Sequence, residues 1–261
     1  MKKLSVKDLS VMGKRVFVRV DYNVPLSSED GSTSVADDRR IVESLPTLRA
    51  ILEAGGSVVA ASHLGRPKGK KEPKYSLAPV ARRLSELLGR PVAFAADCIG
   101  PVAQAAASSL KPGEVLLLEN LRYYKEEEAD DASFAAELAK LGDLYVNDAF
   151  GAAHRAHASV HAMAGRFKNA AAGLLMEKEL ASLGRLLTDP GRPFVVVVGG
   201  AKISDKIDLL ENLMARCNSL IIGGAMAFTF LRALGHQIGS SLVESDKEMQ
   251  ARDLVTLAAV K

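Results

Sequence analysis

Cysteine is scarce in this chain, which has two, Cys98 and Cys217, among 261 residues. They lie in different halves of the sequence without CxxC spacing, so neither a disulfide framework nor a zinc site is expected. We interpret both as buried, neutral thiols in a reducing compartment. The chain also lacks a large excess of charge of either sign, because its 34 Lys and Arg residues are nearly balanced by 31 Asp and Glu residues, which leaves a net charge of +3. This balance gives no overall field that would attract nucleic acid, so anion binding must depend on local placement of arginine.

Long apolar runs are also missing. The longest, such as FVVVV (194–198), fall far short of the roughly 18 residues that a membrane span needs. Lys2 and Lys3 near the start are followed by polar residues and not by the apolar segment of a signal peptide. We therefore expect no membrane association and a cytoplasmic location.

The common nucleotide and nucleophile motifs are missing too. Neither GxxxxGK[ST] nor a strand-linked GxGxxG occurs, so no Walker A loop or dinucleotide fingerprint supports nucleotide binding. No Ser/His/Asp or Cys/His arrangement has the context of a nucleophile elbow.

What is present, over the first two-thirds of the chain, is an alternation of apolar runs with helical stretches. We expect strands at 15–20, 57–61, 91–95, 114–120 and 143–150, and helices at 38–54, 81–89, 101–110 and 131–142. An irregular loop is expected at 26–36, where Ser, Asp and Gly are frequent. The βαβ repetition predicts an α/β domain with a doubly wound parallel sheet.

A change of pattern follows this domain. A single long amphipathic helix is predicted near 171–189, and prolines then break the chain before a new apolar strand. We expect a first domain at 1–170, an interdomain helix at 171–190 and a second α/β domain at 191–261. Its two recognisable strands and their helices are too few to cover both faces of a sheet. We therefore expect an incomplete Rossmann-like second domain that exposes apolar surface.

Strands of the first domain end on residues that suit an anion. Asp21 and Asn23 follow the first strand, His63 and Arg66 the second, Arg122 a later one and Arg155 the last, while Arg40 opens a helix. The carboxyl ends of parallel strands meet at one edge, where ligands bind in open α/β sheets. Arginine forks match carboxylate and phosphate oxygens two at a time. Single positions have plainer explanations, namely ion pairs, an Asx turn at Asp21 or a loop histidine, but together they predict a pocket for a small, multiply charged anion.

The segment GGAKISDK (199–206) predicts a second anion site. We expect a helix to open there directly after a buried strand, with Lys202 and Lys206 one turn apart on the same face. The glycines allow the backbone to approach a phosphate, and Gly223-Gly224 repeats the arrangement after the next strand. A plain turn between strand and helix is the alternative. His154 and His157 flank Arg155, but no carboxylate or cysteine joins them at metal-ligand spacing.

Seven segments together resemble one known family. They are RVDYNVPL (19–26), DDRRIVESLPTL (37–48), SHLGRP (62–67), LLLENLRY (116–123), VNDAFGAAHRAHAS (146–159), GGAKISDKI (199–207) and IIGGAMAFTF (221–230). These long, ordered motifs are similar to those of phosphoglycerate kinase and span nearly the whole chain.

The resemblance implies an enzyme of glycolysis with two lobes. It implies reversible phosphoryl transfer between ATP and 3-phosphoglycerate, giving ADP and 1,3-bisphosphoglycerate, with Mg²⁺ accompanying the nucleotide and lobe closure excluding water. Carried over by motif, the phosphoglycerate site is Asp21, Asn23, Arg40, His63, Arg66, Arg122 and Arg155. The nucleotide contacts are Gly200, Ala201, Lys202, Lys206 and Gly224. Arg40, Lys202 and Lys206 are the implied catalytic residues, and Arg40 is preferred to Arg39 because it directly precedes Ile41.

Some positions depart from the family pattern. Ala152 and Ala225 stand where the family often has Thr and Gly. Later family segments, which supply much of the nucleotide pocket and the aspartate that holds Mg²⁺, are not found. We therefore expect a truncated chain without a metal ligand of its own. A chain that binds phosphoglycerate without turnover is the alternative function, and the family resemblance favours a monomer.

Overall fold

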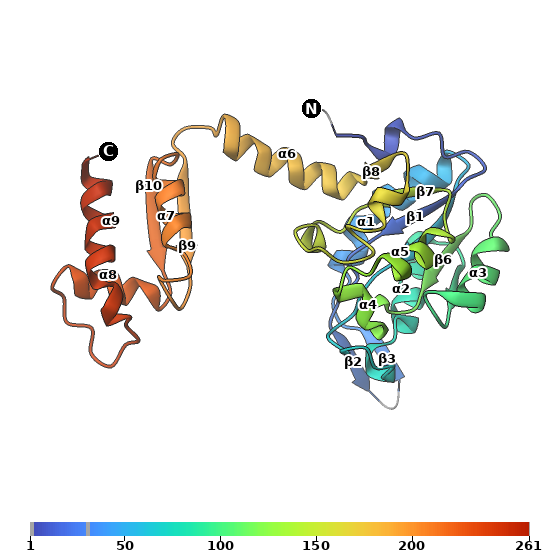
Figure 1. The fold of residues 1–261 in the computed structure, drawn as a ribbon, viewed down its shortest axis with the longest axis horizontal. Helices are drawn as coiled ribbons and strands as arrows, with labels where there is room; N and C mark the ends of the chain where they lie inside the picture. Colours follow the sequence, from blue (N-terminus) through green and yellow to red (C-terminus); the bar gives the residue numbers. More distant parts are fainter. Residues whose placement is uncertain (1–2, 30–31, 261) are drawn as a thin grey trace. The chain divides into compact units, whose positions relative to one another are not determined.

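The computed structural model describes residues 3–29 and 32–260. The chain divides into two compact units, Met1–Ser182 and Leu183–Lys261. Helix α6 (Leu174–Thr188), in the region expected to connect two domains, crosses this division. Each unit is therefore described separately (Figure 1). Within the described ranges, no helix is both long and apolar enough to cross a membrane.

A six-stranded parallel sheet forms the centre of the first unit, in the order β5-β6-β4-β1-β7-β8. Its strands are β1 (Arg15–Arg19), β4 (Ser57–Ala61), β5 (Val92–Ala95), β6 (Val115–Leu118), β7 (Leu144–Asn147) and β8 (Ala170–Ala172). The five strands expected here are confirmed. The strands whose ends carry the predicted anion ligands, β6, β4, β1 and β7, are consecutive neighbours in this sheet, so their carboxyl ends share one stretch of its edge.

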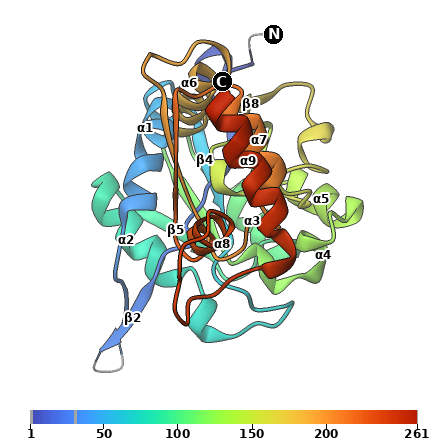
Figure 2. The same cartoon turned by 90° about the vertical axis from the view of Figure 1, so that its left-hand side faces the viewer.

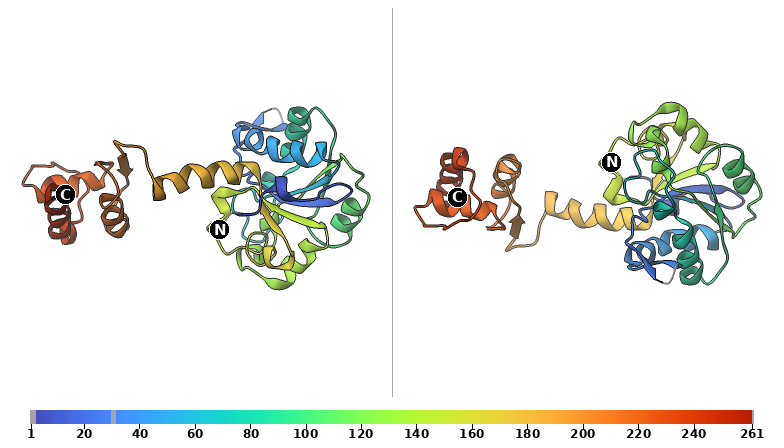
Figure 3. Two further views of the ribbon diagram at one scale, coloured as in Figure 1. Left: turned by 90° about the horizontal axis from the view of Figure 1, so that it is seen from above. Right: turned by 90° about the horizontal axis from the view of Figure 1, so that it is seen from below.

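Helices cover both faces of this sheet, which confirms the doubly wound fold. The longer ones are α1 (Arg39–Glu53), α2 (Ala78–Leu88), α3 (Gly100–Ser108) and α5 (Ala132–Ala139), and α4 (Lys125–Glu128) is a single turn. Buried side chains of α1 and α2 pack on one face, and those of α3 and α5 pack on the other. Figure 3 shows the blue and teal helices α1 and α2 on one side and the green helix α5 on the opposite side.

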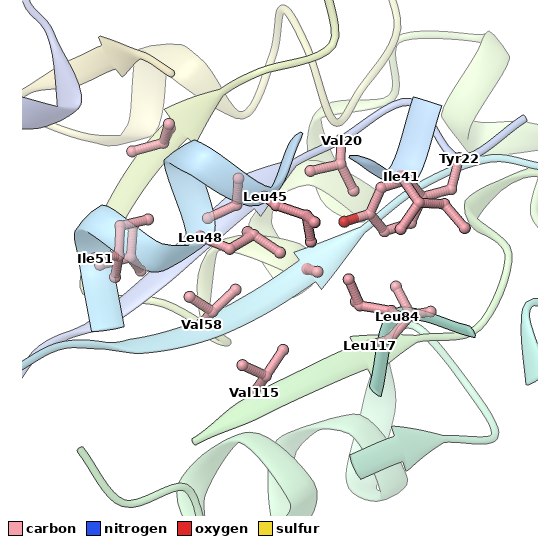
Figure 4. Packing of buried hydrophobic residues seen from close by; sticks show 14 of the residues in the cluster. Val20, Tyr22, Ile41, Leu45, Leu48, Ile51, Val58, Leu84, Val115 and Leu117 are labelled. Atoms are coloured by element: carbon pink, nitrogen blue, oxygen red, sulfur yellow. The ribbon is translucent and has the colours of Figure 1, made fainter. Parts of the chain in front are cut away.

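The alternation of side chains along β1 explains this arrangement. Val16 and Val18 face α1 and α2, whereas Phe17 lies in the other core, and all three are fully buried. Figure 4 shows the first core, in which Leu45 and Leu48 of α1 lie over the sheet. Burying each such side chain is worth about 1.5–3 kcal/mol. Arg19 lies on the Phe17 side of the strand, because successive side chains point to opposite faces.

Two sequence expectations about the first unit are wrong. The region 26–36 is not irregular but forms an antiparallel hairpin of β2 (Leu26–Glu29) and β3 (Ser32–Val35), which projects from the unit in Figures 1 and 2. Hydroxyl pairs across the hairpin, such as Ser27 Oγ and Ser34 Oγ at 3.0 Å, support a pairing that composition did not reveal.

The second wrong expectation concerns the start of the connecting helix. It was expected at residue 171, but Ala170–Ala172 forms strand β8 beside β7, and α6 begins at Leu174. The chain is held to the sheet where Gly173 N donates to Asn147 O at 2.9 Å. Three consecutive alanines suit a helix as well as a short edge strand, so pairing with β7 decides between them.

The second unit has a two-stranded parallel sheet of β9 (Val195–Gly199) and β10 (Ser219–Gly223). Its helices are α7 (Ile207–Met214), α8 (Met226–Ala233) and α9 (Glu248–Val260). Its core gathers Ile203, Leu210, Met226, Phe230, Ala233, Ala251 and Leu254. Val197, in contrast, is 70% exposed and Ile221 is 53% exposed. The expected exposed apolar surface is confirmed.

Short 3₁₀ helices complete the described structure. They are η1 (Val6–Asp8), η2 (Pro73–Tyr75), η3 (Leu121–Tyr123), η4 (Phe150–Ala152), η5 (Ala164–Arg166) and η6 (Ser245–Lys247). Two of them, η3 and η4, directly follow the carboxyl ends of β6 and β7, where anion ligands were predicted.

Candidate anion-binding site at the carboxyl edge of the sheet

One cavity of about 280 Å³ lies at the carboxyl edge of the first unit's sheet. It is lined by Asp21, Asn23, Arg40, His63, Gly65, Arg66, Arg122, Gly151, Ala152 and Arg155. All seven residues that the sequence assigned to a phosphoglycerate site are among them. The structure therefore brings together side chains from the ends of four neighbouring strands and from the start of α1.

Asp21 and Asn23 are fixed by bonds among themselves and their neighbours. Asp21 Oδ1 accepts from Asn23 N at 3.2 Å, which is an Asx turn, while Asp21 Oδ2 accepts from Arg40 Nη1 at 2.6 Å. Asn23 Oδ1 accepts from Gly65 N at 2.8 Å. Asp21 therefore shapes the turn, as its alternative interpretation predicted, and also orients the guanidinium of Arg40.

The loop after β4 places His63 and Arg66 and depends on a glycine. Gly65 has φ +61°, and a Cβ there would lie 2.4 Å from the ring of Tyr75. Only glycine fits both this backbone conformation and this close approach. Arg66, one residue further on, is exposed to solvent at the cavity.

Asn120 ties the loop after β4 to the turn after β6. Its buried side-chain oxygen accepts from Leu64 N at 3.1 Å and from Arg122 N at 3.0 Å. Its Nδ2 donates to Leu64 O at 2.7 Å and to Tyr75 O at 2.9 Å. Sequence reasoning missed this residue, although an amide directly after an apolar strand is a common loop-holding signal.

Arg122 is the most buried arginine among those lining the cavity. Its side chain is 6% exposed, and Nη1 donates to Gly65 O at 2.9 Å. Its Nε lies 3.2 Å from Glu128 Oε1 without the geometry of a hydrogen bond. Burial lowers the pKa of Arg122, but a guanidinium stays protonated in proteins. Its charge is thus held at the cavity with few protein partners.

His63 reaches the cavity from a buried polar network that the sequence did not reveal. Its Nδ1 lies 3.1 Å from Nη2 of Arg19, which is fully buried. Burial, followed by the charge of Arg19, lowers the pKa of His63 to about 2, so the imidazole is neutral. The available sequence signal was Arg19, a charged residue that lies between valines within the strand RVFVRV (15–20).

The segment after β7 supplies the last of the predicted anion-binding side chains, Arg155. Arg155 is exposed and lines the cavity, whereas His154 does not line it. His157 is buried, with Nδ1 4.0 Å from Glu127 Oε1 and no hydrogen-bond partner in the described structure. The backbone bond from His157 N to Arg155 O, at 3.0 Å, helps to shape this turn.

The charges that line the cavity are strongly unequal. Four guanidinium groups face one carboxylate, Asp21, which is already paired with Arg40. A larger hollow of about 620 Å³ between β3 and α2 differs, because Arg39 and Arg83 there pair with nearby acids, for example Arg83 with Asp38 at 2.7 Å, while Arg82 donates to Thr33 O. The smaller cavity is therefore the better candidate for an anion site, and its volume suits a small molecule.

In the second unit, the structure brings Gly200, Gly224 and Lys206 together. Gly224 has φ +71°, and a Cβ there would lie 2.7 Å from Gly200 O. A Cβ at Gly200 would lie 2.7 Å from Lys206 Cε, so the lysine stem passes over the glycine. The two glycine turns therefore pack against each other at the carboxyl ends of β9 and β10.

Lys202 does not lie where the sequence placed it. The expected helix opening at this segment is wrong, because α7 begins at Ile207, and Lys202 lies in a loop with Lys206 directly before the helix. Ala201 and Lys202 are exposed. The strand before them is also not buried, since Val195 and Val197 are exposed.

Glu244 holds this loop and was missed by sequence reasoning. Its Oε2 accepts from Ile203 N at 2.6 Å, and its Oε1 accepts from Ser204 Oγ at 2.6 Å. The bond from Ser204 lowers the pKa of Glu244. No sequence signal linked it to residues 40 positions away. Its carboxylate thus bonds two backbone amides within GGAKISDK, the segment for which the sequence predicted an anion site.

Metal ligands are not assembled in the part of the chain that the structure describes. Residues 3–29 and 32–260 contain no group of three or more His, Cys, Asp or Glu side chains arranged to hold an ion.

Comparisons with known proteins agree with the sequence motifs. The family model described as "Phosphoglycerate kinase" matches residues 6–261. The phosphoglycerate kinase of Chlorobium chlorochromatii is 54% identical over 261 residues, which are 100% of this chain and 65% of the relative. That of Moorella thermoacetica is 55% identical with the same coverage. The solved structure of phosphoglycerate kinase from Coxiella burnetii has a TM-score of 0.85 at 41% identity, covering 99% of this chain and 64% of that chain. The chain thus spans about two-thirds of the length of these relatives.

Proposed function

The chain belongs to the phosphoglycerate kinase family, and from that premise we propose that it takes part in reversible phosphoryl transfer between ATP and 3-phosphoglycerate. The products are ADP and 1,3-bisphosphoglycerate. In this proposal the first unit holds the phosphoglycerate, and the second unit contributes contacts to the nucleotide.

The observation that carries the proposal is the set of four arginines around one small cavity. 3-Phosphoglycerate has a phosphate at one end and a carboxylate at the other, and 1,3-bisphosphoglycerate has two phosphates. Guanidinium groups bind such oxygens in pairs, so several are needed to hold both ends at once. Asn23 and neutral His63 are suited to hydrogen bonds with the hydroxyl or the carboxylate.

We propose that the protein catalyses the transfer by positioning the two substrates and by stabilising the negative charge on the phosphoryl group. Phosphoryl transfer involves little covalent work by the protein, so positive groups near the moving phosphoryl oxygens dominate. We assign this role to Arg40 and Lys202, with Lys206 on the nucleotide phosphates and Gly200, Ala201 and Gly224 along the nucleotide. The bond from Arg40 to Asp21 orients the guanidinium at the cavity before substrate arrives.

Mg²⁺ accompanies the nucleotide in this family, but the described residues do not form a ligand cluster for it. The catalytic and nucleotide-binding roles proposed above are therefore assigned only to side chains and backbone groups of this chain, and none of them depends on the metal. A monomeric state and a cytoplasmic location stay predictions from the sequence.

The alternative function, binding of phosphoglycerate without turnover, is not favoured by the family match. Turnover and binding are separable measurements on the same chain. A coupled assay of ATP-dependent turnover, run beside titration calorimetry with 3-phosphoglycerate, distinguishes the two functions. Binding without any turnover would support the alternative, and absence of binding would contradict both.

Arg40 and Arg39 offer a matched pair for testing the proposed roles. Arg40 bonds Asp21 at the cavity, whereas Arg39 bonds Asp37 and does not line that cavity. We expect Arg40→Ala to lower kcat by about 10³-fold or more, as when other arginines that stabilise phosphoryl charge are removed. Arg39→Ala should leave kcat within about twofold of wild type. If Arg40→Ala raised only KM, the transition-state role would be wrong.

A further inference from the structure

We propose that Arg19 is a positioning residue that fixes His63 as its Nε2–H tautomer. His63 would then offer the anion in the cavity a hydrogen-bond donor and not a titrating charge. The identity of that anion rests on the proposed function, but the arrangement of Arg19 and His63 does not.

Arg19 is placed by the register of the sheet. It is the last residue of β1 and pairs with Ala61 of β4 and with Asn147 of β7. Its side chain points to the face that contains Phe17 and Ala61, and His63 follows Ala61 by two residues on that same side. The guanidinium is fully buried beneath the cavity wall and is not one of its lining groups.

The guanidinium is held by bonds on all three nitrogens. Nε donates to Ser159 Oγ at 2.8 Å, and Nη1 donates to the carbonyl oxygen of Val20. Nη2 lies 3.1 Å from His63 Nδ1. With its other nitrogens fixed in this way, the planar fork has little freedom to turn away from the imidazole.

The chemistry of the two groups decides which imidazole nitrogen carries hydrogen. A guanidinium has only donors and is not deprotonated in proteins, so its partner must be an acceptor. Nδ1 of His63 therefore accepts, and the single proton of the neutral ring lies on Nε2. A protonated ring would place an N–H against the N–H of Arg19, which agrees with the low pKa of His63.

The buried charge of Arg19 is balanced by Glu127, whose side chain is also fully buried. Arg19 Nη2 lies 3.9 Å from Glu127 Oε1, and Ser159 Oγ bridges them by donating to the same oxygen at 2.6 Å. Ser159 N donates to Glu127 Oε2 at 3.0 Å. A buried pair gains little net stability over apolar residues, so stability alone does not account for this pair beside the cavity.

Charged and titratable groups from several elements surround His63. They are Arg19 of β1, Arg122 of η3, Arg40 of α1 and His157 after β7, with Glu127 of α4 behind Arg19. Burial, and then the positive charge of the neighbouring arginines, lowers the pKa of His63, so the ring stays neutral over the physiological range. The arginines therefore supply the positive charge that attracts the anion, and His63 supplies a neutral hydrogen-bond donor that orients it.

The first test is nuclear magnetic resonance of the wild-type chain labelled with ¹⁵N-histidine, without ligand. Comparison with His63→Gln identifies the His63 signals among the five histidines. We expect a hydrogen-free Nδ1, a protonated Nε2 and no titration between about pH 5 and 8. A protonated Nδ1, a mixture of tautomers or titration in that range would overturn the proposal, whether or not the chain binds phosphoglycerate.

The second test removes the positioning group while keeping the interior neutral. In Arg19→Met/Glu127→Gln both buried charges are lost, and we expect His63 to show mixed tautomers and to titrate. Arg15→Met is the control, because Arg15 lies in the same strand but bonds Asp143 outside the site, at 2.9 Å. It should leave the His63 signals unchanged.

The same variants are then titrated with 3-phosphoglycerate. We expect the double variant to bind about tenfold more weakly than wild type near pH ~8, as when a charge-assisted hydrogen bond is partly lost. The difference in affinity between wild type and the double variant should become smaller at lower pH, because the imidazole of the variant then becomes protonated and its positive charge attracts the anion. A constant ratio at all pH values, with unchanged His63 signals, would show that Arg19 only fills the core. If wild type did not bind 3-phosphoglycerate, the proposed function would fail, while the ligand-free spectra would still decide the tautomer.

Discussion

Two carboxylates, one in each unit, make nearly the same backbone bonds, yet their pKa values move in opposite directions. In the first unit, Asp148 Oδ1 accepts from Leu175 N at 3.0 Å and from Met176 N at 3.1 Å. In the second, Glu244 Oε2 accepts from Ile203 N at 2.6 Å and from Ser204 N at 3.2 Å. Burial raises the pKa of Asp148, whereas the bond from Ser204 lowers that of Glu244. The backbone bonds are alike, so the favoured protonation state is decided by burial at Asp148 and by the additional hydroxyl bond from Ser204 at Glu244.

The same contrast holds for the two sheets. In the first unit, β1 has apolar cores on both of its faces, and β4 and β6 are buried along their whole length. In the second unit, β9 and β10 cover one core and expose the other face. Polar groups at the carboxyl edge of the first sheet are therefore held by a packed interior. Those of the second unit lie on a loop that is held by a half-exposed side chain.

The largest expected effect tests this contrast with one substitution in each sheet. Val18→Asp in β1 places an unpaired carboxylate in a fully buried core, which costs several kcal/mol, a large part of a typical stability of about 5–15 kcal/mol. Val197→Asp in β9, where the side chain is 70% exposed, should change stability by less than about 0.5 kcal/mol.

Tyrosine near-ultraviolet circular dichroism during urea unfolding measures the first unit selectively, because all five tyrosines lie in it. Hydrogen exchange of the β9 amides measures the second. The contrast between the sheets would be wrong if Val18→Asp kept a wild-type unfolding midpoint, or if Val197→Asp removed the protection of β9.

A smaller effect is expected where single side chains hold loops. Asn120→Ala removes four hydrogen bonds in the interior and leaves their buried partners unpaired, so we expect a loss of about 2 kcal/mol or more. The affinity for 3-phosphoglycerate should fall as well, since Asn120 fixes both Gly65 and Arg122 through their loops. Glu244→Ala should leave unfolding nearly unchanged and raise exchange only at the amides of Ile203 and Ser204.

Urea unfolding and site-resolved hydrogen exchange measure both variants. Equal destabilisation by the two substitutions would contradict the distinction between the buried Asn120 and the half-exposed Glu244. A loss of phosphoglycerate affinity in Glu244→Ala would also contradict it, because that side chain lies in the second unit.

The sequence predicted the cavity well because it depends on few physical rules. Parallel strands align their carboxyl ends, so Asp21, His63, Arg122 and Arg155 had to come close once the strands were recognised. The order β6-β4-β1-β7 then made the four strand ends consecutive. The resemblance to the family added the individual roles, which stay proposals.

What the sequence did not predict depends on contacts between distant segments. Arg19 was not assigned to the site from the sequence, because only the pairing of β1 with β4 places it beside His63. Glu244 and Asn120 hold loops through bonds whose partners no spacing rule identifies. Lys202 was misplaced because local propensity does not fix where a helix begins, and here α7 starts five residues later.

The smallest expected effect returns to the two carboxylates. The folded pKa of Asp148 is raised above its unfolded value, so its contribution is fully present below the unfolded pKa of about 3.9 and is lost as pH rises through the folded pKa. Asp148→Asn keeps an oxygen for both backbone amides and removes the charge, so the first unit should gain up to about 1.5 kcal/mol of stability near neutral pH and nothing at low pH.

The folded pKa of Glu244 is lowered, so its bonds should be lost only as pH falls through that value. Urea unfolding followed by tyrosine signals over a pH series measures the first effect, and exchange at Ser204 measures the second. If Asp148→Asn were less stable than wild type at neutral pH, the carboxylate would be stabilising despite its burial, and the contrast between the units would lose its electrostatic basis.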